Sequence, residues 1–278
     1  MSSPGAQLSQ WPPVGLLLGR LGKRVGGRAL LFGLIVLGVF AFFAQVVSTL
    51  ALQSPTFDEE FHLARAYAYV RTGDLRMQQN HPPLVSVLAG LPLLLMPELT
   101  PPAQIPHWDD AFLFEFADSL CWRLGHDVDK MLFLARFSIV VVGTLLGACV
   151  CRWAREAHGW RSALLASGLY AAAPNLLAHS GLVTTDLAVT AASFGALFLF
   201  WRYLRRPRPR RMLAAGLAVG LALTAKLSGL FVLPVIGLLA LWDGRRQPPL
   251  PLPEGTRHAR PGGWRRWLAT WRLAALRV

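Results

Sequence analysis

Charged residues are scarce in this sequence. Only 15% of its 278 residues are Asp, Glu, Lys or Arg, whereas a soluble globular domain usually has about 25%. Long polar tracts, a collagen-like glycine period and a sustained heptad repeat are also lacking, which excludes a disordered chain, collagen and a coiled coil. Since 54% of the residues are hydrophobic and they occur in long runs, the composition indicates an integral membrane protein.

Cysteine is rare as well. The three cysteines, Cys121, Cys149 and Cys151, form no CxxC pair and no even-numbered framework. Cys149 and Cys151 are two residues apart in an apolar helical run, so they point to different sides of a helix and cannot bridge each other. We expect three structural thiols.

Acidic residues are few outside one segment. Residues 53–130 contain eleven of the fifteen acidic residues and five basic ones, a net charge of −6. The rest of the chain has 23 basic and four acidic residues, a net charge of +19, and its basic residues occur in short tracts between apolar runs. This pattern is typical of a polytopic membrane protein, and it argues against the nucleic-acid partner that a net charge of +13 would otherwise suggest.

The apolar runs predict an all-α protein with six membrane spans. The first run is longer than the hydrophobic region of a signal peptide, so we expect it to be retained as an anchor. The predicted spans are residues 29–52, 131–151, 162–178, 182–203, 212–225 and 227–242.

A seventh apolar run, residues 84–96, is short and contains Pro92. If it crossed the membrane, the basic tracts 152–161 and 205–211 would both lie outside. If it lies on the membrane surface or re-enters it, these tracts lie inside, as the positive-inside rule requires. We therefore expect a cytoplasmic N-terminus and a large outer loop, residues 53–130.

The predicted organisation has three parts. Residues 1–28 form a cytoplasmic N-terminus, and residues 29–245 form the transmembrane region. Residues 246–278 form a Pro-rich linker followed by a basic tail, either an amphipathic helix at the inner surface or the start of a further span.

A polar helix is predicted directly after the first span. Thr56 is placed to cap its N-terminus, Glu59 to complete a capping box, and Gly73 to end it. Spacings of four and three residues put Asp58, His62 and Arg65 on one face, which suits a binding or catalytic site. Alternatively, the acidic residues only complement the positive end of the helix dipole.

Three more ionisable residues stand out. His81, in the sequence Asn80-His81-Pro82-Pro83-Leu84, is held at the headgroup level, where it could bind a phosphate or snorkel. Asp186 opens a span and Lys226 separates two apolar runs, and ionisable residues in such segments indicate function by default. The simpler alternatives are a helix-dipole partner for Asp186 and snorkelling for Lys226.

These motifs, in order, resemble the polyprenyl-phosphate-sugar-dependent glycosyltransferases of the GT-C fold. That family includes protein O-mannosyltransferases and lipid A aminoarabinose transferases (family 39). The resemblance extends over residues 29–242, which would be the N-terminal part of such an enzyme. It rests on the sequences Phe57-Asp58-Glu59-Glu60-Phe61-His62, Gly73-Asp74, His81-Pro82-Pro83-Leu84, Pro174-Asn175 with Thr185-Asp186, and Lys226-Leu227-Ser228-Gly229.

The resemblance implies transfer of a monosaccharide from a polyprenyl-phosphate donor to a hydroxyl of a protein, lipid or glycan at the outer face, with inversion. Asp58 would be the general base, with Glu59 and Asp186 as further catalytic acids. The donor and its phosphate would contact His62, Arg65, His81 and Lys226. Asp58, His62 and Asp186 would be candidate ligands of Mg²⁺ or Mn²⁺, although no spacing is diagnostic of a metal site.

The implied location is the inner (plasma) membrane of a bacterium, with a lipid-linked sugar, membrane lipid and an unidentified acceptor as partners. Two alternatives remain at this stage. One is a transporter or flippase in which Asp186, Lys226 and Arg136 line a path. The other is an inactive partner of a longer glycosyltransferase.

Overall fold

The computed structural model describes residues 26–77 and 81–246, and all regular elements in these residues are helical. The chain therefore has the predicted all-α architecture. The elements are α2 (Gly27–Leu50), α3 (Phe57–Thr72), α4 (Leu84–Gly90), η1 (Leu91–Leu95), η2 (Pro102–Gln104), α5 (Leu113–Asp118), η3 (Ser119–Arg123), α6 (Val128–His158), α7 (Trp160–Ala171), α8 (Pro174–Ser180), α9 (Asp186–Arg205), α10 (Pro209–Ala225), η4 (Leu227–Phe231) and α11 (Val232–Arg246).

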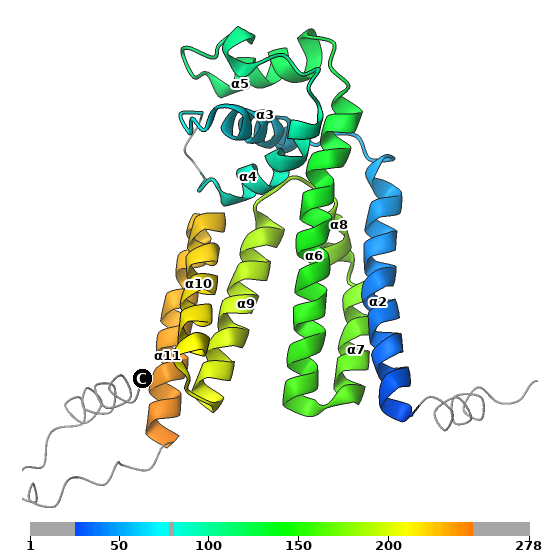
Figure 1. The fold of residues 1–278 in the computed structure, drawn as a ribbon, viewed down its shortest axis with the longest axis vertical. Helices are drawn as coiled ribbons and strands as arrows, with labels where there is room; N and C mark the ends of the chain where they lie inside the picture. Colours follow the sequence, from blue (N-terminus) through cyan, green and yellow to red (C-terminus); the bar gives the residue numbers. More distant parts are fainter. Residues whose placement is uncertain (1–25, 78–80, 247–278) are drawn as a thin grey trace, which may run out of the picture.

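A bundle of upright helices carries a layer of short helices at one end (Figure 1). Among the described residues, α2, α6 and α9 are long and apolar enough to cross a membrane. The α7–α8 pair, α10 and the η4–α11 pair run between the same two ends of the bundle. The six predicted apolar segments thus all belong to the upright bundle of a multi-pass membrane protein.

Two predicted spans depart markedly from the helices of the structure. The run 162–178 is not one helix, because α7 ends at Ala171 and α8 begins at Pro174, whose missing backbone N–H cannot continue the α7 hydrogen-bond ladder. The run 182–203 becomes helical only at Asp186. These breaks leave residues 172–173 and 181–185 as non-helical connections inside the bundle.

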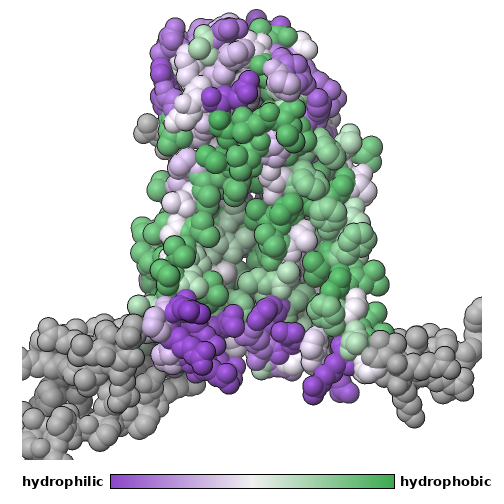
Figure 2. All heavy atoms as spheres, viewed as in Figure 1, coloured by the Kyte–Doolittle hydropathy of each residue, from purple (hydrophilic) through white to green (hydrophobic). Residues whose placement is uncertain are grey.

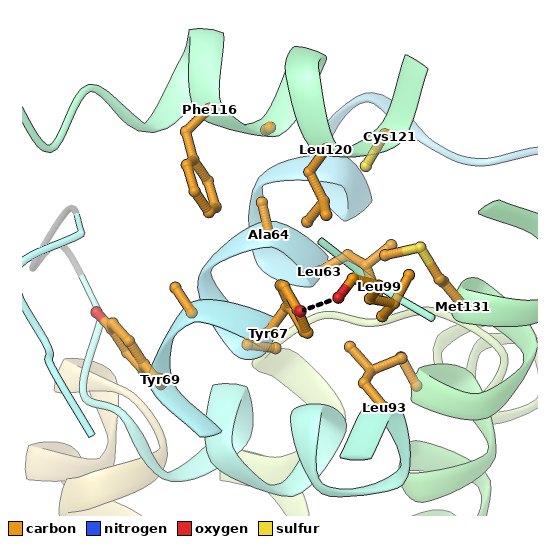
Figure 3. Packing of buried hydrophobic residues seen from close by; sticks show 14 of the residues in the cluster. Leu63, Ala64, Tyr67, Tyr69, Leu93, Leu99, Phe116, Leu120, Cys121 and Met131 are labelled. Atoms are coloured by element: carbon orange, nitrogen blue, oxygen red, sulfur yellow. Dashed lines mark hydrogen bonds between the residues drawn. The ribbon is translucent and has the colours of Figure 1, made fainter. Parts of the chain in front are cut away.

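The layer across the end of the bundle has its own hydrophobic core. Leu63 and Tyr67 of α3 pack with Leu93, Phe116 and Leu120 (Figure 3). The Tyr67 hydroxyl donates hydrogen bonds to the carbonyl oxygens of Leu99 (3.2 Å) and Thr100 (2.9 Å), so its polar atom is satisfied within this core. The layer is therefore a packed unit that holds α3 in a fixed position.

The run 84–96 lies within this layer and does not cross the bundle. It forms α4 and η1, and α4 sits beneath α3 and above the end of α10 (Figure 1). Gly90 makes the close packing with α3 feasible, since a Cβ atom there would lie 2.4 Å from the Ala66 carbonyl oxygen. The structure agrees with the placement of this run at one end of the protein.

Hydrophilic residues gather at the two ends of the molecule, with a hydrophobic belt between them (Figure 2). We call the end formed by α3, α4 and α5 the acidic end, and the end formed by residues 152–161 and 205–211 the arginine end. Both basic tracts lie together, opposite the acidic segment, as the parity of six spans predicts. The predicted N-terminal segment before residue 26 and the linker and tail after residue 246 lie outside the described residues.

Candidate active site

The first turn of α3 places Asp58 and Glu59 on different sides of the helix. The predicted capping box forms: the Thr56 backbone N–H and hydroxyl each donate to Glu59 Oε2, at 3.0 and 3.1 Å. Gly73 ends the helix in the left-handed conformation, also as predicted. Glu59 is fully buried, whereas Asp58 is exposed and forms no hydrogen bond or ion pair with any residue that the structure describes.

Glu59 forms a buried ion pair with Arg136 of α6. Arg136 Nε donates to Glu59 Oε1 (2.8 Å) and Arg136 Nη2 donates to Glu59 Oε2 (2.7 Å). The Val183 backbone N–H also donates to Glu59 Oε1 at 2.9 Å. Burial raises the pKa of the Glu59 carboxyl, but the hydrogen bonds from Arg136, Thr56 and Val183 outweigh it and hold that pKa below its usual value. Glu59 is thus ionised and fully engaged in the framework beneath the site.

Arg136 also binds the end of the first span. It donates to the carbonyl oxygens of Leu50 (3.1 Å), the last residue of α2, and of Gln53 (2.8 Å) and Ser54 (3.1 Å), which follow α2. With the two bonds to Glu59, its guanidinium has five protein acceptors. One side chain therefore fixes α2, α3 and α6 relative to one another, and Val183 adds the connection that leads into α9.

His62, Arg65 and His81 form a second group beside Asp58. Arg65 Nη2 lies 2.6 Å from His62 Nδ1, and Arg65 Nε donates to the hydroxyl of Ser86 on α4 at 3.1 Å. The His62 and His81 rings are stacked, with centroids 5.9 Å apart. The helical face predicted from the spacing of His62 and Arg65 thus extends onto the segment that carries His81.

The imidazoles of this group are neutral at physiological pH. Burial and the positive charge of Arg65 lower the pKa of His62 to about 4, with a further contribution from His81. Burial also lowers the pKa of His81, as do the charges of Arg65 and Lys226. Arg65 and Lys226 are consequently the cations closest to this part of the site.

Asp186 and Lys226 meet at the acidic end of the bundle. Asp186 is the first residue of α9, and Lys226 occupies an extended position between α10 and η4. Lys226 Nζ lies 2.5 Å from Asp186 Oδ1. The interruption of the helix between α10 and η4 depends on Gly229, where a Cβ atom would lie 2.1 Å from the Ala222 carbonyl oxygen. This close approach explains the glycine of Lys226-Leu227-Ser228-Gly229.

The separate groups converge around His81. Four charged side chains act on its imidazole: Asp58 and Arg65 of α3, Asp186 of α9, and Lys226 at the break between α10 and η4. His179 of α8 in turn acts on Asp186. The structure therefore brings together all the predicted site residues except Glu59, which lies in the framework below.

Exposed aromatic side chains flank Asp58. Phe57 is 76% exposed, and its ring contacts Phe61 edge to face, with centroids 5.2 Å apart. The ring of Phe61 contacts that of Phe114 of α5, with centroids 4.6 Å apart, and the ring of Phe114 contacts that of Phe112. The exposed carboxylate thus stands at the edge of an apolar surface that reaches across the layer.

The candidate metal ligands do not form a coordination site. Among residues 26–77 and 81–246, no group of three or more His, Cys, Asp or Glu side chains could hold a metal ion. His62 Nδ1 is occupied by Arg65, and Asp186 is paired with Lys226. In the described residues, Asp58, His62 and Asp186 are therefore not assembled as one three-ligand site.

A family model described as dolichyl-phosphate-mannose-protein mannosyltransferase matches residues 111–252. The chain belongs to this family. It is accordingly a multi-pass membrane glycosyltransferase that uses a polyprenyl-phosphate-linked sugar, which favours this function over the transporter alternative. The matched region includes Arg136, Asp186 and Lys226, whereas Asp58 and His81 precede it. No curated protein and no solved structure gives a significant match.

Sequence reasoning missed the partner of Glu59. The sequence predicts Arg136 only as part of a transport path, although an arginine inside the apolar run 131–151 requires a partner at that depth. The signal for pairing is its position, five residues after the start of the run and therefore level with the end of the first span. Ser86 and Val183 carry no comparable signal, because a hydroxyl and a backbone N–H are common in any segment.

Proposed function

We propose that the enzyme transfers a monosaccharide by a single displacement with inversion, with Asp58 as the general base. The convergence around His81 is the observation that supports this proposal. An exposed carboxylate that binds no described residue shares one site with the cations Arg65 and Lys226. Such a pairing suits removal of a proton from an acceptor hydroxyl and stabilisation of a departing phosphate.

The roles divide between the two sides of the site. Asp58 takes the proton of the acceptor hydroxyl as the acceptor oxygen bonds to the anomeric carbon and the bond from that carbon to the phosphate oxygen breaks. Lys226 and Arg65 would bind the polyprenyl phosphate that leaves, and the neutral His81 would donate a hydrogen bond to it. Asp186 would orient Lys226 through their ion pair. No step in this scheme requires a metal ion.

The acceptor would approach over the apolar surface of Phe57, Phe61 and Phe114, which adjoins Asp58. We propose that the acidic end faces outward from a bacterial plasma membrane and that the N-terminus is cytoplasmic. The positive-inside rule supports this orientation, because the two basic tracts of the described residues, 152–161 and 205–211, lie at the opposite end.

The decisive experiment compares Asp58→Asn with Asp109→Asn, which changes another exposed aspartate of the same layer. Purified enzyme in liposomes is given polyprenyl-phosphate mannose and a membrane extract as acceptor source, and release of polyprenyl phosphate is measured. Loss of a general base should lower the rate about 10²–10⁴-fold, and the control should retain the rate. An undiminished rate for Asp58→Asn would remove the proposed base.

The stereochemical part has a separate readout. A β-linked donor should give an α-linked product, which the anomeric coupling in an NMR spectrum distinguishes. Retained configuration would contradict single displacement even if Asp58 proved essential. If wild-type enzyme released no polyprenyl phosphate with any acceptor extract, the alternative of an inactive partner would be favoured.

A further inference from the structure

A cavity lies far from the candidate active site, at the arginine end of the bundle. It has a volume of about 420 Å³ and lies between α2, α6 and α7. This volume falls within the roughly 300–1,000 Å³ of ligand sites. The cavity shares no lining residue with the group around His81.

The walls of this cavity are apolar, and the cavity opens at the outer surface of the bundle. Val36 and Phe40 of α2 line one side, and they are 49% and 60% exposed. Ala148 and Cys151 of α6 line the other side, and their small side chains leave the space unfilled. The lining residues of α2 run from Phe32 to Phe43, about 16 Å along the helix, so the cavity is an elongated groove parallel to the helices.

The groove ends in two arginines. Arg152 and Arg155 line it at the arginine end, where Arg155 lies over the Trp160 ring at 4.8 Å and Trp160 contacts Phe32. Arg152 binds Glu156 (2.9 Å), but Arg202 of α9 also binds Glu156 (3.3 Å). Within the part of the chain that the structure describes, no acidic residue lines the groove itself. The groove is therefore positively charged at the end lined by the two arginines and apolar along the rest of its length.

We propose that this groove binds one acyl chain of an anionic phospholipid, whose phosphate contacts Arg152 and Arg155. The charge and the shape of the groove both match such a lipid. The occupant must be apolar along the groove and negatively charged at the level of Trp160, a residue type that is enriched at the membrane interface. Basic pockets between transmembrane helices are known sites for anionic headgroups. The acyl chain of a zwitterionic lipid would fill the groove equally well, but its headgroup would place a positive charge next to the two arginines and would therefore bind less favourably.

Native mass spectrometry of the full-length protein in mild detergent tests this site. The protein is titrated with phosphatidylglycerol, with phosphatidylcholine of the same acyl chains, and with soluble glycerol phosphate. We expect phosphatidylglycerol to bind more tightly than phosphatidylcholine and glycerol phosphate not to bind. The double variant Arg152→Ala/Arg155→Ala should bind phosphatidylglycerol about 30-fold more weakly and phosphatidylcholine unchanged.

Four further variants distinguish the contribution of the headgroup contacts from that of the apolar groove. Arg210→Ala removes an exposed charge from the other basic tract and should leave phosphatidylglycerol binding unchanged. Ala148→Phe fills the groove from an exposed position and should weaken both lipids, whereas Leu145→Phe, on the same helix outside the groove, should weaken neither. Arg152→Lys/Arg155→Lys keeps both charges and should retain the preference for phosphatidylglycerol.

Several results would overturn the proposal. Equal binding of the two lipids to the wild type would refute the role of the arginines, as would phosphatidylglycerol binding that survives their removal. Lipid binding that is insensitive to Ala148→Phe would refute the groove. If the double alanine variant failed to fold, loss of preference in the lysine variant or in Arg152→Ala alone would decide the same question.

Discussion

Glu59 and Arg136, 77 residues apart in the sequence, form a bidentate ion pair in which both side chains are almost completely inaccessible to solvent. The pair joins the helix that carries Asp58 to the end of the first span and to the connection before Asp186. The position of the exposed Asp58 thus depends on a neighbouring carboxylate that cannot itself reach a substrate.

Breaking this pair should destabilise the fold. In Arg136→Met the Glu59 carboxylate would remain buried without its partner, and removal of one member of a buried pair costs about 3–5 kcal/mol. The double variant Glu59→Leu/Arg136→Met should recover part of this loss, since no charge is left unpaired, but not the bonds to the Leu50, Gln53 and Ser54 carbonyls. Chemical unfolding in detergent, followed by tryptophan fluorescence, measures both. Equal stability of Arg136→Met and the wild type would contradict the structural role.

Lys226 should contribute mainly to binding of the donor phosphate. Lys226→Ala should lower kcat/KM for the lipid-linked sugar about 10–100-fold, the range expected for loss of one hydrogen bond to a charged group. Lys226→Arg keeps the charge and should retain more activity than the alanine variant. Steady-state kinetics over a range of donor concentrations distinguishes these outcomes. Unchanged kinetics in Lys226→Ala would indicate a lysine that serves only to neutralise Asp186.

Stability should fall as the medium becomes acidic, because of His62. Its pKa in the folded protein is about 4, below the ordinary value of 6.5, so the unfolded chain binds the extra proton in the interval between them. The contribution of His62 to stability is therefore complete above pH about 6.5 and is lost as the pH falls toward 4. The His81 pKa is shifted in the same direction and adds to the effect.

Thermal unfolding of the wild type and of His62→Gln at a series of pH values between 7.5 and 4.5 measures this effect. As the pH falls over this range, the melting temperature of the wild type should decrease more than that of the variant. His126→Gln, which changes a histidine elsewhere in the same layer, is the matched control and should follow the wild type. Parallel curves for His62→Gln and the wild type would show that His62 does not titrate as its burial requires.

The acidic end and the arginine end should be reachable from opposite sides of the membrane. Ser54→Cys and Pro207→Cys introduce thiols at exposed positions at the two ends. In intact cells an impermeant maleimide should label the first and not the second. The wild type gives the background, since Cys121 and Cys151 are buried and Cys149 is half-buried. Labelling of both positions from outside would contradict the proposed orientation.

Local patterns predicted local structure well. The capping box and the terminal glycine of α3 are recognisable from spacing alone because their bonds join residues within one helix turn. The opposition of basic and acidic ends follows from charge counts along the chain. The family resemblance predicts one site for Asp58, His81, Asp186 and Lys226, and in the structure the charges of the other three act on His81.

Features that depend on pairing across the bundle were not predictable in the same way. The Glu59–Arg136 bonds require a helix register that sequence spacing does not encode, so Glu59 was grouped with the catalytic acids. The break between α7 and α8 falls inside an apolar run, where hydropathy is uniform and only Pro174 marks it. The groove at the arginine end arises from small side chains on facing helices, and each of them is unremarkable within its own helix.

The contact between Arg65 and His62 limits what the imidazole can do. A guanidinium has only donors, so His62 Nδ1 accepts and the hydrogen of the neutral ring must reside on Nε2. With its lone pair already committed, the ring offers a donor alone to anything that enters. A hydroxyl nucleophile that seeks a proton acceptor on this face of α3 is thereby left with the aspartate one turn earlier.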